Sequence, residues 1–407
     1  MGIFLYLSVK YLKMYKRYLY KKLQAHLSKK HISLITGPRQ VGKTTLMLQL
    51  HNELIAQSKK SFYLSLEDKE IRNGFNVHPE QLFNYIPPIN KNEKYYIFID
   101  EVQYLDDPSN FLKYTFDNYH ENIKLIVSGS SSFYIDNKFT DSLAGRKRIF
   151  MLPTLSFPEF IKFKEREELV EYINTGSLPG IYKKELDKLM HEYLIYGSYP
   201  ELVLEPNLDG KREILKELGT SYIKKDIIDS DIKSPELYYQ ILRLLANQTA
   251  SLYNINSIGK ILKKSNQTIE SYVNAMLKSF HISKISPFYS NFSKEIKKMP
   301  KIYFTDLGLR NFFAKNFEPI ALRTDKGNLF ENFVFRRFYD KYDEMDIQFW
   351  LTQKKHEVDF IINRQKAFEV KFSENQFNRK KYQYFTDKYP EINLQLIHYN
   401  NVNKIEL

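Results

Sequence analysis

The chain has 407 residues, enough for two to four domains that each bury a core. It contains no cysteine, which excludes disulfides, thiolate metal sites and cysteine nucleophiles and fits a reducing cytoplasm. Lys and Arg total 61 against 48 Asp and Glu, and this net charge of +13 favours polyanionic partners. The chain is also rich in Lys, Asn, Ile, Tyr and Phe, the residues that an AT-rich genome favours, so codon bias is an alternative source of part of the charge.

The first thirty residues predict a lead-in rather than a targeting segment. Residues 3–9 are apolar, but the run is short and Lys10 and Lys13 follow it. A signal peptide has its charges first, and a membrane span needs about 20 apolar residues. Residues 14–30 are typical of a helix that leads into the first strand, so we expect no contact with a membrane.

A complete phosphate-binding loop of the form G-x-x-x-x-G-K-[ST] follows a predicted strand at residues 31–36. The loop and the residue after it are Gly37, Pro38, Arg39, Gln40, Val41, Gly42, Lys43, Thr44 and Thr45. The glycines let backbone N–H groups turn inward around a β-phosphate, the lysine reaches the β- and γ-phosphates, and the threonine hydroxyl after it is offered to Mg²⁺. The helix that follows points its positive end at the anion. The motif therefore predicts a site for ATP with Mg²⁺.

A second strand, at residues 95–101, ends in the carboxylates of Asp100 and Glu101. It is apolar on both faces, as strands in the middle of a parallel sheet are, and the loops at the carboxyl ends of such strands form the ligand crevice. We therefore expect Asp100 to lie near Thr44 and hold Mg²⁺ through water, and Glu101 to polarise the water that attacks the γ-phosphate. The paired acids favour an ATPase over a small-molecule kinase.

A third strand, at residues 124–132, runs into small polar residues. In AAA-type ATPases this strand carries the sensor of the γ-phosphate, and Ser128 or Ser130 is the candidate here, with a turn or a helix cap as the alternative reason for these hydroxyls. Arg146, expected near the same edge, is a candidate arginine finger that acts in cis or on a neighbouring subunit of a homo-oligomer. A solvated basic loop or a surface ion pair is the alternative for it.

The character of the chain changes after this strand. Residues 155–245 carry Lys, Glu, Leu and Tyr at helical spacing, with a turn at residues 197–201. This stretch resembles the helical lid that follows the nucleotide core of AAA-type ATPases. We expect a scaffold that moves with the state of the nucleotide.

Residues 252–304 predict a winged helix-turn-helix. A short helix at 254–262 and a turn lead to a longer helix at 267–280, whose buried stripe is Ile269, Tyr272, Val273, Met276 and Phe280. The outward face of that helix is polar but hardly basic, whereas the wing at 293–301 is more basic. DNA contact and an intramolecular or protein contact are therefore both open roles for this module.

A second chemistry is predicted near the carboxyl end. Residues 357–362 and 367–372 are typical of two paired strands, and the pairing brings Asp359 beside Glu369 and Lys371. Two carboxylates bind a divalent ion, and a lysine assists the attack of water on a phosphodiester. This is the layout of the PD-(D/E)xK nuclease fold.

A third acid fits the same pattern. Glu331 is the acid on an otherwise apolar face of a predicted helix at 328–335, and it is placed to complete the metal cluster. The alternative for the whole pattern is a surface hairpin with an ordinary Glu–Lys pair, since E-x-K in a strand also occurs by chance.

Taken together, these motifs resemble those of prokaryotic AAA-type ATPases whose carboxy-terminal domain, of unknown function, looks like a PD-(D/E)xK nuclease. The resemblance runs over nearly the whole chain. The segments that carry it are 37–45, 99–101, 128–132, 143–146, 199–201, 303–310, 329–333, 357–360 and 369–371.

The resemblance implies an α/β fold class: a P-loop parallel-sheet ATPase core with a helical lid, a winged helix-turn-helix and a restriction-endonuclease-like α/β domain. The expected segments are a helical lead-in (1–30), the ATPase core (31–160), the lid (161–245), the winged helix-turn-helix (246–305) and the nuclease-like domain (306–407). Two functions stay open: an ATP-regulated nucleic-acid enzyme with a second divalent metal, or an ATP-dependent switch that binds protein or nucleic acid without cleavage. Both place the protein in the cytoplasm.

Overall fold

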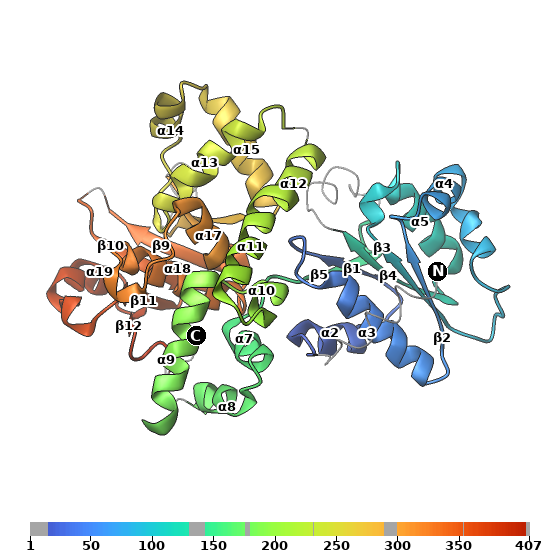
Figure 1. The fold of residues 1–407 in the computed structure, drawn as a ribbon, viewed down its shortest axis with the longest axis horizontal. Helices are drawn as coiled ribbons and strands as arrows, with labels where there is room; N and C mark the ends of the chain where they lie inside the picture. Colours follow the sequence, from blue (N-terminus) through green and yellow to red (C-terminus); the bar gives the residue numbers. More distant parts are fainter. Residues whose placement is uncertain are drawn as a thin grey trace. The chain divides into compact units, whose positions relative to one another are not determined.

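Figure 1 shows the computed structural model of the chain, which has two compact units, Met1–Pro153 and Thr154–Leu407. The structure describes residues 15–129, 143–175, 180–230, 232–288, 299–352 and 354–403. The sensor candidate Ser130 and most of the predicted wing, 293–298, lie outside these residues. Within them, no helix is long and apolar enough to cross a membrane.

The first unit is a five-stranded parallel sheet in the order β2-β3-β4-β1-β5. Its strands are β1 (Ile32–Thr36), β2 (Lys60–Ser65), β3 (Tyr95–Asp100), β4 (Ile123–Gly129) and β5 (Lys147–Met151). In Figure 1, one face of the sheet carries α2 (Tyr18–His26) and α3 (Lys43–Ala56), and the other carries α4 (Lys69–Val77) and α5 (Pro108–Tyr119). The predicted α/β core with a parallel sheet is confirmed.

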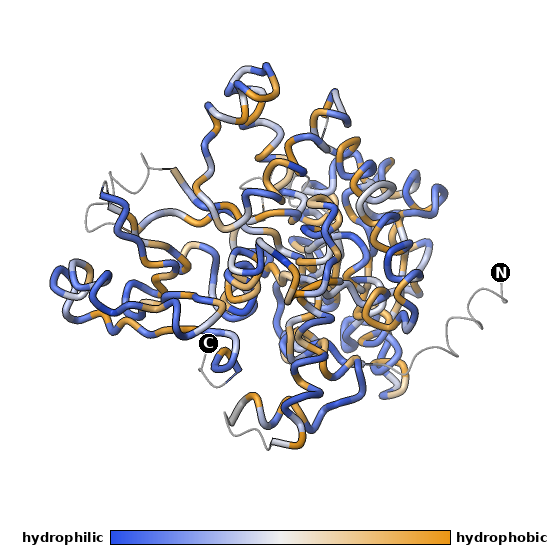
Figure 2. Tube along the Cα trace, turned by 60° about the vertical axis from the view of Figure 1, so that its left-hand side comes forward, coloured by the Kyte–Doolittle hydropathy of each residue, from blue (hydrophilic) through white to orange (hydrophobic). Residues whose placement is uncertain are grey.

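The inner strands are apolar because helices cover both of their faces. Residues of β1 and β4 are buried along their whole length, and Ile97, Ile99, Leu125 and Val127 pack in one cluster with Phe111 of α5. Figure 2 shows hydrophobic and hydrophilic stretches alternating along the chain. This packing fixes the strand ends from which the site residues project.

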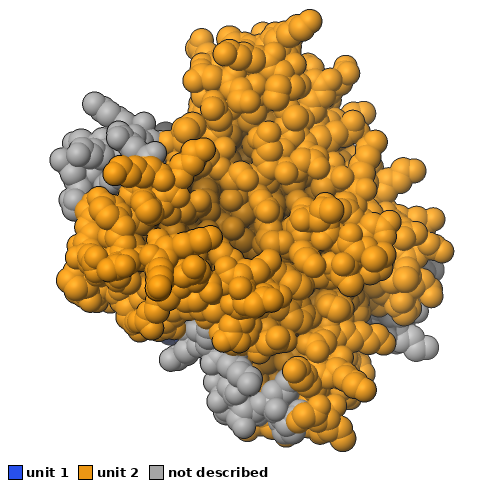
Figure 3. Space-filling view, turned by 90° about the vertical axis from the view of Figure 1, so that its left-hand side faces the viewer, with its two compact units in different colours: residues 1–153 blue, residues 154–407 orange. Residues whose placement is uncertain are grey.

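The second unit begins with helices and then alternates helices with strands. Its helices up to residue 247 are α7 (Phe157–Phe163), α8 (Glu167–Thr175), α9 (Gly180–Tyr196), α10 (Pro200–Leu204), α11 (Leu208–Glu217), a π-helical turn (Leu218–Tyr222), α12 (Ile223–Asp229) and α13 (Pro235–Asn247). Figure 3 shows one face of this unit as a space-filling surface.

One seven-stranded sheet runs through the rest of the second unit, in the order β12-β11-β10-β9-β7-β8-β6. Its strands are β6 (Ser251–Leu252), β7 (Ile282–Pro287), β8 (Lys301–Phe304), β9 (Ile347–Leu351), β10 (Glu357–Ile362), β11 (Lys366–Lys371) and β12 (Asn393–His398). The helices among them are α14 (Ile255–Leu262), α15 (Asn266–Lys278), α17 (Leu307–Ala314), α18 (Lys326–Tyr339) and α19 (Gln383–Lys388).

The strands on either side of the expected boundary at 305 and 306 belong to this same sheet. β7 pairs with β9 in parallel, through Ser286 with Gln348 and Pro287 with Phe349. The expected segment boundaries at 245 and 305 therefore fall inside one compact unit, and the division between the two units lies at 153.

Helices α14 and α15 occupy the two stretches in which the sequence predicts helices. Asn254 and Ser265 cap the two helices by accepting hydrogen bonds from Ser257 N and Thr268 N. Four residues of the predicted stripe on α15 are buried in one core cluster with β7, β8 and α13, namely Ile269, Tyr272, Val273 and Met276. The helix ends at Lys278, so Phe280 follows it, half-buried and with a φ of 59°.

Candidate nucleotide site and acidic cluster

The phosphate-binding loop has the left-handed backbone that its glycines permit. The φ angles are 147° at Gly37, 63° at Gln40 and 91° at Gly42. A Cβ on Gly37 would also lie 2.1 Å from the carbonyl oxygen of Leu152, so the approach of the chain after β5 requires glycine there. The loop therefore depends on both its own conformation and its neighbour.

Lys43 is buried within the loop that it closes. Its Nζ donates to the carbonyl oxygens of Gly37 at 3.0 Å and Pro38 at 2.8 Å. Arg17, from outside the motif, donates to the carbonyl oxygen of Val41 at 2.8 Å and to that of Pro153 at 2.8 Å. Arg17 thus ties the loop to the chain beyond β5, a role for which the sequence pattern gives no signal.

Asp100 gathers three hydroxyls at the carboxyl ends of the strands. Its Oδ2 accepts from Thr44 Oγ1 at 2.7 Å and from Tyr63 OH at 2.6 Å, and its Oδ1 accepts from Ser128 Oγ. The expected proximity of Asp100 and Thr44 is thus observed, because β1, β4 and β3 are parallel neighbours. Burial and then the Asp100 charge raise the pKa of Tyr63 well above its ordinary value. Tyr63, which the sequence pattern did not reveal, lies in the edge strand β2 in register with Phe98, two residues before the strand ends at Ser65.

Glu101 leaves β3 with a φ of 57°, a left-handed conformation that few non-glycine residues adopt. Its backbone N–H donates to Ser128 Oγ at 3.0 Å, and its carboxylate accepts from Gln103 Nε2. The buried Ser128 hydroxyl therefore fixes both Asp100 and the start of the Glu101 turn. Backbone strain of this kind clusters at functional sites.

The expected placement of Arg146 at the nucleotide edge is wrong. Arg146 precedes β5, and its carbonyl oxygen accepts from Ile32 N at the amino end of β1. In a parallel sheet that end is opposite the phosphate-binding loop, about 16 Å away along a five-residue strand. Its guanidinium forms a two-pronged pair with Asp117, at 2.6 Å and 3.1 Å. A finger role in cis does not fit this position.

In the second unit, the predicted hairpin brings its carboxylates together. β10 and β11 are antiparallel with Phe360 opposite Phe368, which places Asp359 across from Glu369. Asp359 Oδ2 accepts from Val370 N at 2.9 Å and lies 3.9 Å from Lys371 Nζ, which also contacts the Glu369 carboxylate. Asp359, Glu369 and Lys371 therefore form one group, as the register predicts.

Glu331 joins this group through a lysine that the sequence argument assigned to the wing. Lys301 Nζ lies 3.0 Å from Glu331, 2.5 Å from Glu357 and 3.5 Å from Asp359, and its side chain is only 3% exposed. Tyr303, two residues along β8 and on the same face, donates to Glu331 at 2.7 Å. We call Lys301, Glu331, Glu357, Asp359, Glu369 and Lys371 the acidic cluster.

The position of Glu331 is set by its neighbour in α18. The side chain of Asn332 accepts from Phe304 N at 3.0 Å and donates to Phe304 O at 2.8 Å. The amide thus makes both backbone hydrogen bonds that a neighbouring strand would make with the end of β8. This pairing holds the helix against the strand that carries Lys301. The available signal for Lys301 was its place in a short strand, because side chains two residues apart, such as Lys301 and Tyr303, share a face.

The cluster is electrostatically strained by its burial. Burial, and then the Asp359 charge, raise the pKa of Glu331 to about 7 and that of Glu369 to about 8. Burial opposes the charge on Lys301, but Glu331, Asp359 and Glu357 together raise its pKa well above the ordinary value. The two lysines are the cations that compensate the acids in this part of the chain.

The acidic cluster fits a divalent ion only in part. Glu369 Oε2 is buried and accepts no hydrogen bond of good geometry among the described residues, although Tyr382 interacts with the same carboxylate. Yet across those same residues no group of three or more His, Cys, Asp or Glu side chains is arranged to hold a metal ion. Lys301 stands among the acids instead.

Comparison with known families divides the chain into three matched regions. Residues 29–161 match the AAA domain, residues 187–319 a domain of unknown function (DUF8612), and residues 326–407 another domain of unknown function (DUF4143). The first match contains the phosphate-binding loop, Asp100 and Ser128. The first unit is thus an AAA-type P-loop domain.

Curated relatives match over most of the chain. An uncharacterized protein of Methanocaldococcus jannaschii is 28% identical over 398 residues, which cover 94% of this chain and 85% of the relative. An uncharacterized protein of Haemophilus influenzae is 27% identical over 385 residues, covering 89% and 88%. Among solved structures, Cdc6p from Pyrobaculum aerophilum matches at 10% identity and a TM-score of 0.33, covering 80% of this chain and 97% of that one.

Proposed function

We propose that the first unit binds ATP with Mg²⁺ and hydrolyses it. The observation that carries the proposal is the hydrogen bond of 2.7 Å between Thr44 Oγ1 and Asp100 Oδ2, beside the phosphate-binding loop. A hydroxyl and a carboxylate are hard oxygen donors of the kind that Mg²⁺ prefers, so these two residues would hold the ion. When bound, the ion supplies positive charge against the phosphates.

The chain's own groups have separate roles in this proposal. Lys43 exchanges the carbonyl oxygens of Gly37 and Pro38 for phosphate oxygens, which are stronger acceptors because they are charged. Glu101 orients the attacking water and accepts its proton. Ser128 is a positioning residue, since its hydroxyl contacts Asp100 and the Glu101 backbone.

The test is nucleotide binding and phosphate release by Lys43→Ala beside the wild type. We expect at least a tenfold weaker affinity for ATP, because a charge-assisted hydrogen bond is worth about 1.5–3 kcal/mol. Lys69→Ala, which removes an exposed lysine at the start of α4, is the matched control and should bind as the wild type does. Equal affinity in Lys43→Ala would contradict the proposed site.

A second candidate function is metal-dependent cleavage of nucleic acid at the acidic cluster. It is favoured by the convergence of Asp359, Glu369 and Lys371 and by the buried Glu369 Oε2, which accepts no hydrogen bond of good geometry among the described residues. Asp359 and Glu369, joined by Glu331, are the residues that would hold a divalent ion, and Lys371 would donate a hydrogen bond or proton to the reacting phosphate. ATP hydrolysis in the first unit would then regulate this activity.

The competing function is an ATP-dependent switch whose second unit binds protein or nucleic acid without cutting. Lys301 favours it, because a lysine that already compensates Glu331, Glu357 and Asp359 makes the cluster stable without a metal. Both candidate functions include self-association, because Arg146, from its position in the sheet, acts as an arginine finger only on the nucleotide of a neighbouring copy.

Calorimetric titration with Mn²⁺ separates the two. The cleavage proposal expects the wild type to bind one more Mn²⁺ than Asp359→Ala does; equal binding by the two proteins supports the switch. Linear, circular, single-stranded and branched DNA or RNA are then incubated with Mg²⁺ or Mn²⁺, with and without ATP. Cleavage that survives Lys371→Ala undiminished would exclude the catalytic role of that lysine.

A further inference from the structure

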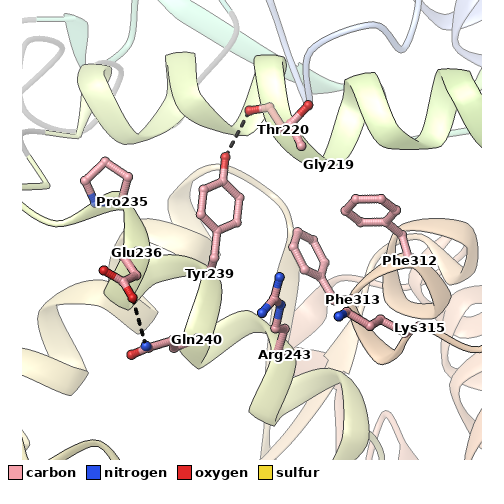
Figure 4. A pocket seen from close by; sticks show the side chains of 10 residues that line it. All are labelled: Gly219, Thr220, Pro235, Glu236, Tyr239, Gln240, Arg243, Phe312, Phe313 and Lys315. Atoms are coloured by element: carbon pink, nitrogen blue, oxygen red, sulfur yellow. Dashed lines mark hydrogen bonds between the residues drawn. The ribbon is translucent and has the colours of Figure 1, made fainter.

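The second unit contains a pocket of about 530 Å³ between the π-helical turn, α13 and α17. Figure 4 shows Gly219 and Thr220 on one side, the α13 side chains on another, and Phe312 and Phe313 of α17 opposite. This volume is in the range of sites that bind small molecules. None of the residues discussed above for ATP or for the acidic cluster lines it.

Aromatic rings form the wall of the pocket. The Tyr239 hydroxyl donates to the Thr220 carbonyl oxygen at 3.0 Å, which fixes its ring, and that ring lies 6.2 Å from the ring of the buried Phe313. Phe312 packs beside Phe313 at 5.2 Å. A Cβ on Gly219 would lie 2.3 Å from Phe312, so glycine in the π-helical turn lets this ring stand close to the helix. Single π-helical turns are frequent at functional sites.

Two cations point into the same space. Figure 4 shows the ends of the Arg243 and Lys315 side chains directed toward the pocket beside Phe313. Both residues are exposed. At the far end, the Glu236 carboxylate accepts from Gln240 Nε2 at 3.5 Å. In Figure 4 the two cations lie at one end of the pocket together with Phe312 and Phe313, Tyr239 stands in the middle, and Glu236 and Gln240 lie at the other end.

We propose that this pocket binds a nucleotide unit, either free or as part of a single strand. A phosphate dianion matches the two cations Arg243 and Lys315, as a single carboxylate does not. A base has a planar face for Tyr239 and Phe312, and stacking of bases on aromatic side chains is the usual way in which single strands are held. The N–H groups of a base edge find acceptors in Glu236 and Gln240. The proposal is independent of ATP hydrolysis in the first unit.

The test measures binding to the full chain carrying Lys43→Ala, so that the phosphate-binding loop adds little signal. Equilibrium dialysis with labelled cytidine monophosphate probes the free nucleotide, and fluorescence anisotropy with end-labelled tetracytidylate probes the strand. Arg243→Ala should weaken both about tenfold, and Phe312→Leu should weaken both several-fold. Arg379→Ala, which removes an exposed arginine elsewhere in the unit, is the matched control and should leave both unchanged. Thermal melting verifies that each variant folds.

The two sources give different results. Comparable affinity for the monophosphate and the tetranucleotide assigns the site to a free nucleotide, and a tetranucleotide that binds more than tenfold tighter assigns it to a strand; both support the proposal. It is overturned if neither probe binds, if Arg379→Ala weakens binding as much as Arg243→Ala does, or if inorganic phosphate or an acidic tyrosyl peptide displaces the probe as well as cytidine monophosphate does.

Discussion

Replacing Lys301 by methionine removes the cation at the centre of the acidic cluster and keeps the length of its stem. Three carboxylates lose this cation, those of Glu331, Glu357 and Asp359, at 3.0, 2.5 and 3.5 Å from the Lys301 nitrogen; Glu331 keeps its hydrogen bond from Tyr303, and Asp359 keeps Val370 N and Lys371. The Glu331 and Asp359 side chains are 14% and 8% exposed, so water replaces little of what they lose.

The cost follows from these distances. At an effective dielectric constant of ~20, one pair at about 3 Å represents ~5 kcal/mol of Coulomb energy, which desolvation of the lysine offsets in part. Truncating one partner of a buried ion pair costs about 3–5 kcal/mol, and we expect a loss of that size in the free energy of unfolding at pH 8.

The loss should shrink as the pH falls. Glu331 has a folded pKa of about 7, above its ordinary 4.5. Its protonation therefore stabilises the fold fully below pH 4.5, and this stabilisation is lost as the pH rises through 7. Without Lys301 the folded pKa of Glu331 rises further, because the proton replaces the missing cation. The variant is therefore closest to the wild type at pH 5 and furthest from it at pH 8.

Trp350 makes the assay specific, since it is the single tryptophan of the chain and is buried in β9 of the same sheet. Urea unfolding followed by its fluorescence at pH 5 and pH 8 reports on the second unit. Lys366→Met, at the exposed start of β11, should change stability by less than about 0.5 kcal/mol. A loss below about 1 kcal/mol at pH 8, or an equal loss at both pH values, would refute the reasoning.

Three further predictions concern the first unit. Burial, and then the Lys94 charge, lower the pKa of Lys124 from 10.5 to about 7. Between pH 7 and about 10 the unfolded chain therefore binds a proton that the folded chain has released, and stability should rise with pH over that range. Lys124→Met should abolish this slope in thermal melts, and an unchanged slope would contradict the assignment. Thr44→Ala should raise the Mg²⁺ concentration for half-maximal ATP turnover at least about tenfold. Tyr63→Phe removes the other hydrogen bond to Asp100 Oδ2 and should change that concentration less than about twofold. Equal effects of the two substitutions would show that Thr44 has no special role. Asp117→Asn should lower stability by less than about 1 kcal/mol, because the Arg146–Asp117 pair is exposed. It should leave ATP turnover of the isolated chain unchanged, because the pair lies at the end of the sheet opposite the phosphate-binding loop. A loss of turnover at low protein concentration would contradict that placement.

The sequence predicted the parts of the site that local pattern controls. The phosphate-binding loop, the Asp100 strand end and the pairing of Asp359 with Glu369 all follow from motif spacing and strand alternation. Each depends on residues near in sequence or on adjacent strands, whose geometry is nearly fixed.

The parts that depend on distant packing were not predictable in this way. Lys301 looked like an exposed basic wing residue, and only the seven-stranded sheet carries it to acids 30 to 58 residues away. Arg146 was misplaced because its motif does not reveal whether it precedes or follows a strand. Tyr63 lies within an edge strand that has no motif of its own, so only the order β2-β3-β4 brings it to Asp100.

The central claim, that the first unit hydrolyses ATP through Glu101, is tested most directly by Glu101→Gln beside the wild type. Equilibrium binding of ATP and steady-state release of phosphate are measured on the same preparations. The account predicts that ATP affinity stays within about twofold while turnover falls ~10²–10⁴-fold, as expected for loss of a general base. Equal turnover in the two proteins would contradict it.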